Sequence, residues 1–99
     1  MGDTIERVSD FFKNFSDYTR LKIVKELLNE EFSVTELSER LGISQTAVSH
    51  QLRILREARI VKYRREAQQI FYTIDDKHIK EMLMIITQRL RLITQKKIE

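Results

Sequence analysis

The sequence has no cysteine, only two glycines and two histidines, and no long apolar run. Without cysteine it can form no disulfide, no thiolate metal site and no thiol-based redox sensor. Two glycines are too few for a glycine-rich loop that holds nucleotide phosphates. No candidate nucleophile stands with its base, so we expect neither an enzyme nor a cofactor.

Membrane and export signals are also missing. The longest purely apolar run, residues 82–86, is far too short to span a bilayer. Asp3 and Glu6 stand where a signal peptide would be basic, and position six lacks the serine or threonine that myristoylation requires. We therefore expect a soluble intracellular protein with no membrane partner.

The charge is more informative in its distribution than in its sum. Residues 1–99 make one domain with a modest core, of a size that dimerisation often stabilises. A net charge of +3 permits nucleic-acid binding but does not by itself argue for it. Five glutamates lie between residues 26 and 39, whereas no acidic residue occurs from 41 through 56.

Residues 33–57 have the pattern of two short helices joined by a tight corner. The apolar face of the first helix is formed by Val34, Leu37 and Leu41. Gly42 follows where a helix end needs a left-handed residue, and Ser44 is a good N-cap for the second helix. The buried stripe of the second helix is formed by Ala47, Val48, Leu52 and Leu55.

The opposite face of the second helix is polar and lacks acids. Its side chains are Gln45, Thr46, Ser49, His50, Arg53 and Arg56, with Ser44 at the cap. Short hydrogen-bonding side chains at a helix N-terminus suit the reading of base edges in the major groove, where a carboxylate would repel phosphate. A solvated face of an all-α protein is the alternative, but the corner and the missing acids together favour a DNA-reading helix-turn-helix.

The N-terminal segment is expected to form an amphipathic helix over about residues 3–15, capped by Asp3 or Thr4. Its apolar face is formed by Ile5, Val8, Phe11, Phe12 and Phe15. Three phenylalanines are more than a monomer of this size easily covers, so this face is compatible both with the core and with a second subunit.

A second helix is expected over residues 18–28, after Ser16 and Asp17 end the first and cap the next. Its buried residues are expected to be Leu21, Ile23, Val24, Leu27 and Leu28. The basic residues left for solvent or phosphate are Arg20, Lys22 and Lys25. Residues 29–32 form a short connector into the helix pair.

Two short runs of β-branched and aromatic residues follow the helix pair: Ile60, Val61 and Tyr63, then Ile70, Phe71, Tyr72 and Ile74. Residues 64–69 between them are expected to form a polar turn, which lacks glycine. Two strands with a basic tip over about residues 60–74 are typical of the wing of a winged helix-turn-helix. Its candidate contacts with phosphates or the minor groove are Lys62, Arg64 and Arg65. A plain solvated hairpin is the alternative.

Asp75 and Asp76 cap a long last helix over about residues 76–95, whose apolar residues approach heptad spacing. This stripe is longer than internal packing needs, so we expect the first and last helices to form a homodimer interface. Its residues would be Ile5, Val8, Phe12, Ile79, Leu83, Ile86, Leu90 and Ile93. A two-fold dimer would place its recognition helices about 34–36 Å apart, as palindromic operators require.

The runs DYTRL at residues 17–21 and ISQTAVSHQLR at residues 43–53 resemble the ArsR/SmtB family of bacterial repressors. The resemblance covers nearly the whole chain and implies a homodimeric winged-helix repressor that releases an inverted-repeat operator when an effector binds. The residues that match the family's base-reading and phosphate-positioning groups are Gln45, Thr46, Ser49 and His50. We accordingly expect a bacterial cytoplasmic location, on the nucleoid when the protein is bound to double-stranded DNA.

Many members of this family sense metals, and here the sequence departs from the pattern. The family's Cys-x-Cys pair falls on Ser33 and Thr35, whose hydroxyls cannot replace thiolates for a soft metal ion. Asp76 and His78 match one half of a second family site. The other half falls on two residues that cannot ligate, Arg89 and Leu92. Two ligands are too few for tight zinc binding, so we expect no metal site.

Three functions from different classes remain open. We expect a sequence-specific DNA-binding repressor that does not respond to metal, with its effector unknown. A metal-sensing repressor would use Asp76 and His78 together with ligands that the sequence does not reveal. A winged-helix protein-interaction module would keep its activity when Gln45 or His50 is replaced by alanine.

Overall fold

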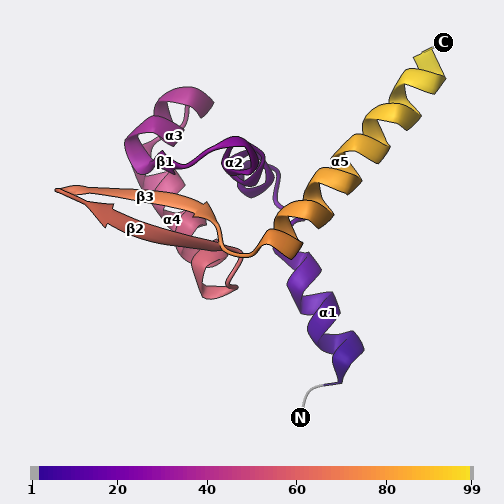
Figure 1. Ribbon diagram of the computed structural model, residues 1–99, viewed down its shortest axis with the longest axis horizontal. Coiled ribbons are helices and arrows are strands. Elements are labelled where there is room, and N and C mark those ends of the chain that lie inside the picture. The colour runs from indigo at the N-terminus through magenta and orange to yellow at the C-terminus, as the bar shows by residue number, and fades with distance from the viewer. Residues whose placement is uncertain (1–2, 99) are drawn as a thin grey trace.

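The computed structural model describes the backbone of residues 3–98 and the side chains of residues 3–91. In chain order the elements are α1 (Thr4–Lys13), α2 (Tyr18–Asn29), β1 (Phe32–Ser33), α3 (Val34–Leu41), α4 (Gln45–Glu57), β2 (Val61–Glu66), β3 (Gln69–Ile74) and α5 (Lys77–Ile98). Figure 1 shows α1 and α5 on one side of the molecule and the β2–β3 hairpin reaching out on the other. This mainly helical winged helix-turn-helix confirms the predicted fold class.

The sheet is antiparallel, with strand order β1-β3-β2. Strands β2 and β3 stay paired as far as Glu66 and Gln69, so Ala67 and Gln68 alone form the loop. The prediction of a polar turn over residues 64–69 is therefore wrong, because exposed polar residues continue the strand pairing almost to the tip of the hairpin. Ala67 takes a φ of +56°, the positive range that two-residue hairpin loops require.

Strand β1 lies where the sequence predicted only a connector. Phe32 pairs with Tyr72 of β3, and the Phe32 side chain is buried. The guanidinium carbon of Arg40 lies 4.6 Å from the centroid of the Phe32 ring and covers it. A strand of two residues has no period to detect, which is why the sequence did not reveal it.

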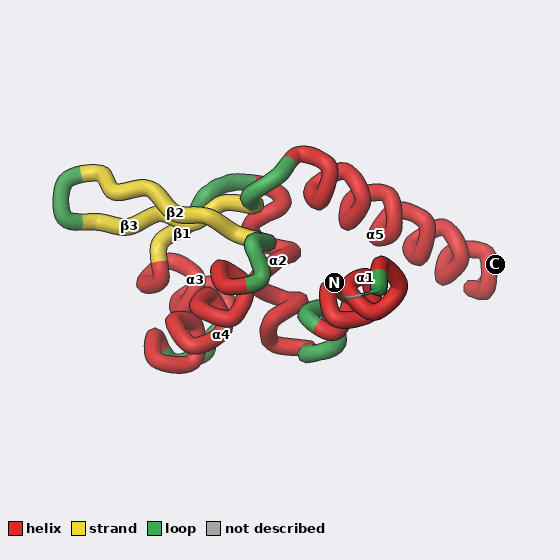
Figure 2. The backbone as a smooth tube through the Cα atoms, turned by 90° about the horizontal axis from the view of Figure 1, so that it is seen from below, coloured by secondary structure: helices red, strands yellow, loops and turns green. Residues whose placement is uncertain are grey.

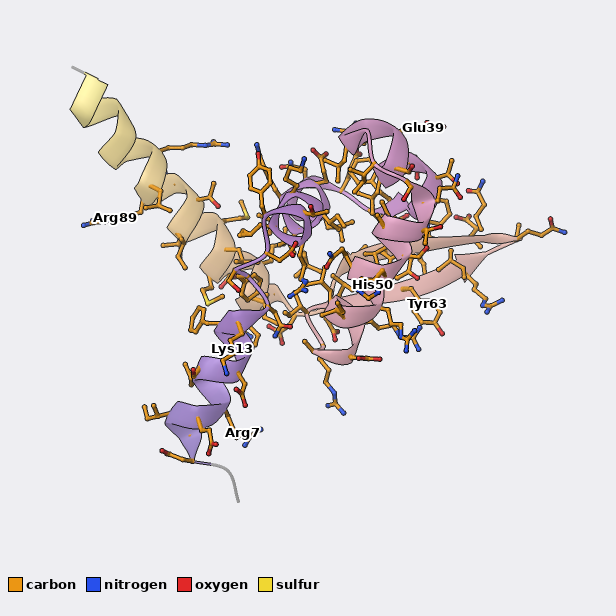
Figure 3. All side chains as sticks on the ribbon, turned by 180° about the vertical axis from the view of Figure 1, so that it is seen from behind. Arg7, Lys13, Glu39, His50, Tyr63 and Arg89 are labelled. Atoms are coloured by element: carbon orange, nitrogen blue, oxygen red, sulfur yellow. The ribbon has the colours of Figure 1, made fainter. Side chains whose placement is uncertain are left out.

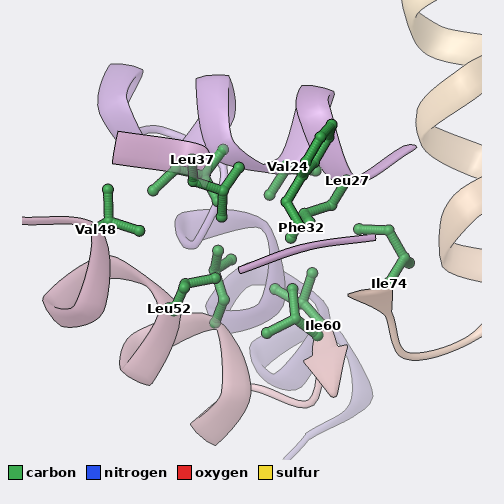
Figure 4. Close-up of a cluster of buried hydrophobic side chains, with 11 residues drawn as sticks. Val24, Leu27, Phe32, Leu37, Val48, Leu52, Ile60 and Ile74 are labelled. Atoms are coloured by element: carbon green, nitrogen blue, oxygen red, sulfur yellow. The ribbon is translucent and has the colours of Figure 1, made fainter. Parts of the chain in front are cut away.

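The core fills the space between α2, α3, α4 and the sheet (Figure 4). Its buried side chains are Ile23, Val24, Leu27, Phe32, Leu37, Val48, Leu52, Leu55, Ile60, Val61 and Ile74. Leu21, which was expected in this core, is 37% exposed, so that prediction is wrong. Leu21 lies at the flank of the α2 face that Ile23 and Leu27 direct inward.

Local capping interactions fix the corner between α3 and α4. Ser33 and Glu36 form a capping box at the start of α3, each side chain accepting from the other's backbone N–H. Gly42 has a φ of +67°, which confirms the predicted left-handed residue, and nothing lies within 4 Å of where a Cβ would stand. Glycine is therefore needed for the backbone conformation and not for space. The Ser44 hydroxyl accepts from the backbone N–H of Ala47 at 3.0 Å, as expected of an N-cap.

The C-terminal end of α4 is a Schellman motif. The backbone N–H of Ile60 donates to the carbonyl of Leu55 at 2.9 Å, and that of Arg59 donates to Arg56 at 3.0 Å. Leu55 and Ile60 are both buried, which supplies the apolar contact that usually accompanies this motif. Arg59 takes the left-handed position, with a φ of +59°.

Replacing Arg59 with glycine is expected to stabilise the fold, because a side chain in the left-handed region costs energy that glycine avoids. We expect a gain of about 0.5–1 kcal/mol, or a melting temperature about 2–8 °C higher. Thermal unfolding followed by circular dichroism measures it. Arg59→Ala is the control, since it removes the charge but keeps the Cβ and should give no comparable gain. A glycine variant that melts no higher than the wild type would contradict this account.

The first and last helices stand apart from the core. Helix α1 ends at Lys13 rather than near residue 15, because Asn14 caps it and donates from Nδ2 to the Phe11 carbonyl at 3.0 Å. Figure 2 shows α1 beneath α5, with α5 extending away from the sheet and from the α3–α4 pair. Within the described residues no helix is both long and apolar enough to cross a bilayer.

Candidate nucleic-acid interface

Helix α4 separates a buried face from an exposed one. Val48, Leu52 and Leu55 are buried in the core, while Ala47 is half-buried at the edge. The predicted DNA-facing side chains are all exposed: Ser44, Gln45, Thr46, Ser49, His50 and Arg53. Figure 3 labels His50 on α4. The N-terminal half of this helix therefore offers hydroxyl, amide and imidazole groups without a carboxylate.

Arg20 of α2 holds the inner side of α4 in place. Its Nε donates to Oε1 of Gln51 at 2.9 Å, and its Nη1 donates to the Asn14 carbonyl at 3.3 Å. These bonds connect the C-cap of α1 and the body of α2 to the recognition helix. The expectation that Arg20 is left for solvent or phosphate is therefore wrong. The sequence did not predict this role of Gln51, because no local pattern links Arg20 and Gln51, which lie far apart in the chain.

Arg64 in the wing is held by carboxylates. Its Nε donates to Oε2 of Glu31 at 2.9 Å and its Nη1 to Oε2 of Glu66 at 2.9 Å, while Nη2 also donates to Glu31. The guanidinium carbon lies 4.9 Å from the centroid of the Phe71 ring. The hydrogen bonds from Arg64 lower the pKa of Glu31, and those carboxylates raise the pKa of Arg64. Contact between Arg64 and phosphate stays a prediction, and it would require these bonds to open.

The other face of β2 connects the wing with α4. The guanidinium carbon of Arg56, at the end of α4, lies 4.6 Å from the centroid of the Tyr63 ring. Tyr63 pairs across the sheet with Tyr72, and their ring centroids are 6.0 Å apart. Arg65 follows two residues after Tyr63, so it lies on the same face of the strand. Arg65 is exposed and makes no ion pair with any residue the structure describes.

Lys62 lies on the opposite face of β2 from Arg65, the face that also carries Arg64. Its side chain is exposed at the base of the wing. The wing therefore directs basic side chains to both of its faces, and Arg65 lies on the face that continues from the recognition helix.

Comparison with known proteins identifies a family. The profile described as "Bacterial regulatory protein, arsR family" matches residues 17–63. The transcriptional repressor SmtB homolog of Synechocystis sp. is 35% identical over 89 residues, which cover 90% of this chain and 67% of that protein. The chain belongs to the ArsR family. It is a DNA-binding transcriptional regulator with a winged helix-turn-helix and not an enzyme, which confirms the resemblance seen in the sequence.

Solved structures of similar proteins share the fold. HlyU from Vibrio cholerae has a TM-score of 0.80 and 36% identity, covering 89% of this chain and 96% of that one. The transcriptional repressor BigR from Xylella fastidiosa has a TM-score of 0.76 and 36% identity, covering 85% and 86%. Against three full-length relatives the chain spans 63–67% of their lengths.

The residues at the family's metal positions do other work in this chain. Ser33 caps α3, as described above. Asp76 caps α5, since its Oδ1 accepts from the backbone N–H of His78 at 2.6 Å and of Ile79 at 3.3 Å. The backbone hydrogen bonds that the Asp76 carboxylate accepts, above all the one from His78, lower the pKa of Asp76. The Nδ1 of His78 lies 3.2 Å from the same oxygen, and no group of three or more potential ligands exists among the described residues. Two ligands, one of them occupied in capping, do not fit a tight zinc site.

Apolar side chains of α1 and α5 remain exposed in the single chain. Ile5 is 73% and Phe12 47% exposed on α1, and Ile86 is 43% exposed on α5, with Val8 and Leu90 also exposed. Ile79 and Leu83, also predicted at the dimer interface, are half-buried against the chain's own core. Phe11 of α1 and Phe15, just after that helix, pack there too, so the apolar face of α1 also contributes to the core. The predicted contact through Ile93 lies outside the residues whose side chains are described.

Proposed function

We propose that this protein is a homodimeric repressor that binds an inverted-repeat operator and does not respond to metal ions. The observation that carries the proposal is the two-sided recognition helix. Its inner face is anchored in the core by Val48, Leu52 and Leu55. Its outer face presents the DNA-facing set, with no carboxylate from Gln45 through Arg56. That combination fits a rigid helix placed in the major groove.

The apolar surface on α1 and α5 supports the dimer. Both helices lie on the side of the domain away from the hairpin tip, so pairing them leaves α4 and the wing open (Figure 1). A two-fold axis through this surface would repeat the recognition helix at a spacing of about one DNA turn. The relatives are named both ways, HlyU as a transcriptional activator and BigR as a repressor. The direction of regulation therefore needs its own measurement in a purified transcription reaction.

Selection of binding sites from a random duplex library, with and without zinc, tests the proposal. Enrichment of the same inverted repeat in both samples is the expected result. Enrichment that zinc abolishes would replace it with a metal-sensing repressor using Asp76 and His78. Absence of any enriched sequence would favour a winged-helix protein-interaction module instead. His78→Ala is the matched variant, since it should leave the zinc-containing sample unchanged.

Replacing Gln45 with alanine is expected to reduce sequence discrimination. A bidentate contact to a base edge contributes about 1–3 kcal/mol, so the ratio of affinities for the selected and a mismatched duplex should fall by about 5–150-fold. Fluorescence anisotropy with both duplexes measures this ratio, and His50→Ala should act in the same direction. A Gln45→Ala variant that weakens binding to all duplexes equally would assign this residue to the DNA backbone.

Replacing Arg65 with alanine is expected to weaken binding to all duplexes similarly. Loss of one phosphate contact in each subunit should reduce the slope of log affinity against log salt concentration by about one unit per subunit, or about two for the dimer. Titrations at four or more salt concentrations give the slope. Arg53→Ala gives the salt slope after loss of a positive charge from α4 instead of the wing. Arg53 pairs with Glu57 at 3.5 Å on the exposed surface of that helix. A slope unchanged in Arg65→Ala would exclude Arg65 as a phosphate contact.

A further inference from the structure

A pocket of about 300 Å³ lies between the C-terminal half of α2 and the middle of α5. Its lining residues are Lys25, Leu28 and Asn29 from α2 and Met84, Thr87, Gln88 and Arg91 from α5. None of them belongs to the DNA-facing set, to the wing or to the Asp76–His78 pair. The pocket is therefore separate from every site described above.

The chemistry of the lining is that of an anion site. Lys25 and Arg91 bring two positive charges, and no carboxylate is found among the described lining residues. Within the part of the chain that the structure describes, neither cation makes an ion pair. Two cations facing one space repel each other, and an anion placed between them replaces that repulsion with attraction. An arginine fork also matches the paired oxygens of a carboxylate or phosphate.

The remaining lining residues define the rest of the ligand. The amides of Asn29 and Gln88 can donate hydrogen bonds to it. The Thr87 hydroxyl donates to the Leu83 carbonyl at 2.8 Å, so its proton is already used. Leu28 and Met84 give an apolar wall on which a short hydrocarbon body can lie. A volume of about 300 Å³ is at the lower end of the range for small-molecule sites.

We propose that this pocket binds a small organic anion, with its carboxylate or phosphate head between Lys25 and Arg91 and an apolar body against Leu28 and Met84. The site is compatible with the proposed dimer. At 100° per residue, the pocket-lining residues of α5 point about 130° away from the line of Ile79, Ile86 and Leu90. Pairing of α5 along that line leaves the pocket open to solvent.

The position of the pocket gives the anion a regulatory consequence. Helix α2 belongs to the body that carries the recognition helix, whereas α5 is the proposed dimer helix. A ligand that touches both favours one angle between them, and so one spacing of the two recognition helices, over others. This consequence rests on the proposed function, whereas binding of the anion does not.

The binding test uses ¹⁵N-labelled full-length protein, titrated with hexanoate, monohexyl phosphate and the neutral hexan-1-ol at constant ionic strength. We expect saturable shifts of the side-chain amide signals of Asn29 and Gln88 with one or both anions, half-complete on the order of 1 mM. Hexanoate against hexyl phosphate distinguishes the preferred head group. An equal response to hexan-1-ol, or no saturation below about 50 mM, would overturn the proposal.

Two pairs of variants place the site. Lys25→Met and Arg91→Met should each weaken anion binding at least about tenfold, because each removes a charge-assisted bond. Lys22→Met and Arg89→Met remove the same charges from α2 and α5 outside the pocket and should bind as the wild type does. Unchanged affinity in the first pair, in spectra that show a folded protein, would overturn the proposal.

A second readout separates the site from its consequence. The affinity for the selected duplex is measured with and without the bound anion, in the wild type and in Lys25→Met. An anion effect on DNA binding that disappears in the variant supports regulation, and an anion that binds without changing DNA affinity refutes it. If no duplex is selected at all, the proposed function fails, and the titration still decides whether the pocket binds an anion.

Discussion

Replacing Ile86 with glutamate is expected to leave the protein monomeric and to lower its affinity for a two-half-site operator by about 10²–10⁴-fold. The loss arises because two linked half-site contacts become independent ones. Ile86 is 43% exposed and lies outside the core, so the variant should still fold. In a dimer interface an unpaired carboxylate would lose its water, which strongly opposes association. A charge at Leu83 would be a weaker test of the dimer interface, because that side chain also packs against the chain's own core.

Multi-angle light scattering during gel filtration measures the mass of the variant against the 11.9 kDa of one chain. Gln88→Glu is the matched control, since it adds the same charge to α5 on the side of the pocket and should remain dimeric. A dimeric Ile86→Glu variant would remove α5 from the interface. A monomeric variant with undiminished operator affinity would show that dimerisation is not needed for DNA binding.

Replacing Leu52 with alanine is expected to destabilise the fold by about 2–5 kcal/mol, through lost burial and the cavity left behind. Leu52 is 1% exposed. It lies on the inner face of α4, the recognition helix, and belongs to the buried core (Figure 4). For a domain of this size each kcal/mol lowers the melting temperature by about 4–8 °C, so we expect a fall of at least about 8 °C.

Equilibrium unfolding in urea measures this change, at one protein concentration because a dimer's stability depends on concentration. Thr46→Ala is the control on the same helix, since its exposed side chain should change stability by no more than about 0.5 kcal/mol. A Leu52→Ala variant as stable as the control would contradict the packing of α4 described above. Loss of DNA binding in a folded Thr46→Ala variant would instead reflect the interface.

The sequence by itself determined the helix-turn-helix, because every signal for it acts over a few residues. Gly42 marks the left-handed corner, Ser44 caps α4 and the inner stripe of α4 repeats at helical spacing. The polar outer face of α4, which carries no acidic residue from Gln45 through Arg56, follows from the same periodicity. The family was also readable from two short runs, at residues 17–21 and 43–53.

The tertiary structure alone decided which charged residues remain available. Arg64 looked free in the wing, yet it bonds to Glu31, which is 33 positions away, and Arg20 bonds to Gln51 over 31 positions. Such pairs form when separate elements pack, and neither spacing nor composition encodes which elements meet. The same holds for the pocket, whose Lys25 and Arg91 face one space because α2 and α5 lie side by side in the fold. Local secondary structure depends on neighbouring residues, whereas the environment of a charged side chain depends on contacts between elements that are distant in the chain.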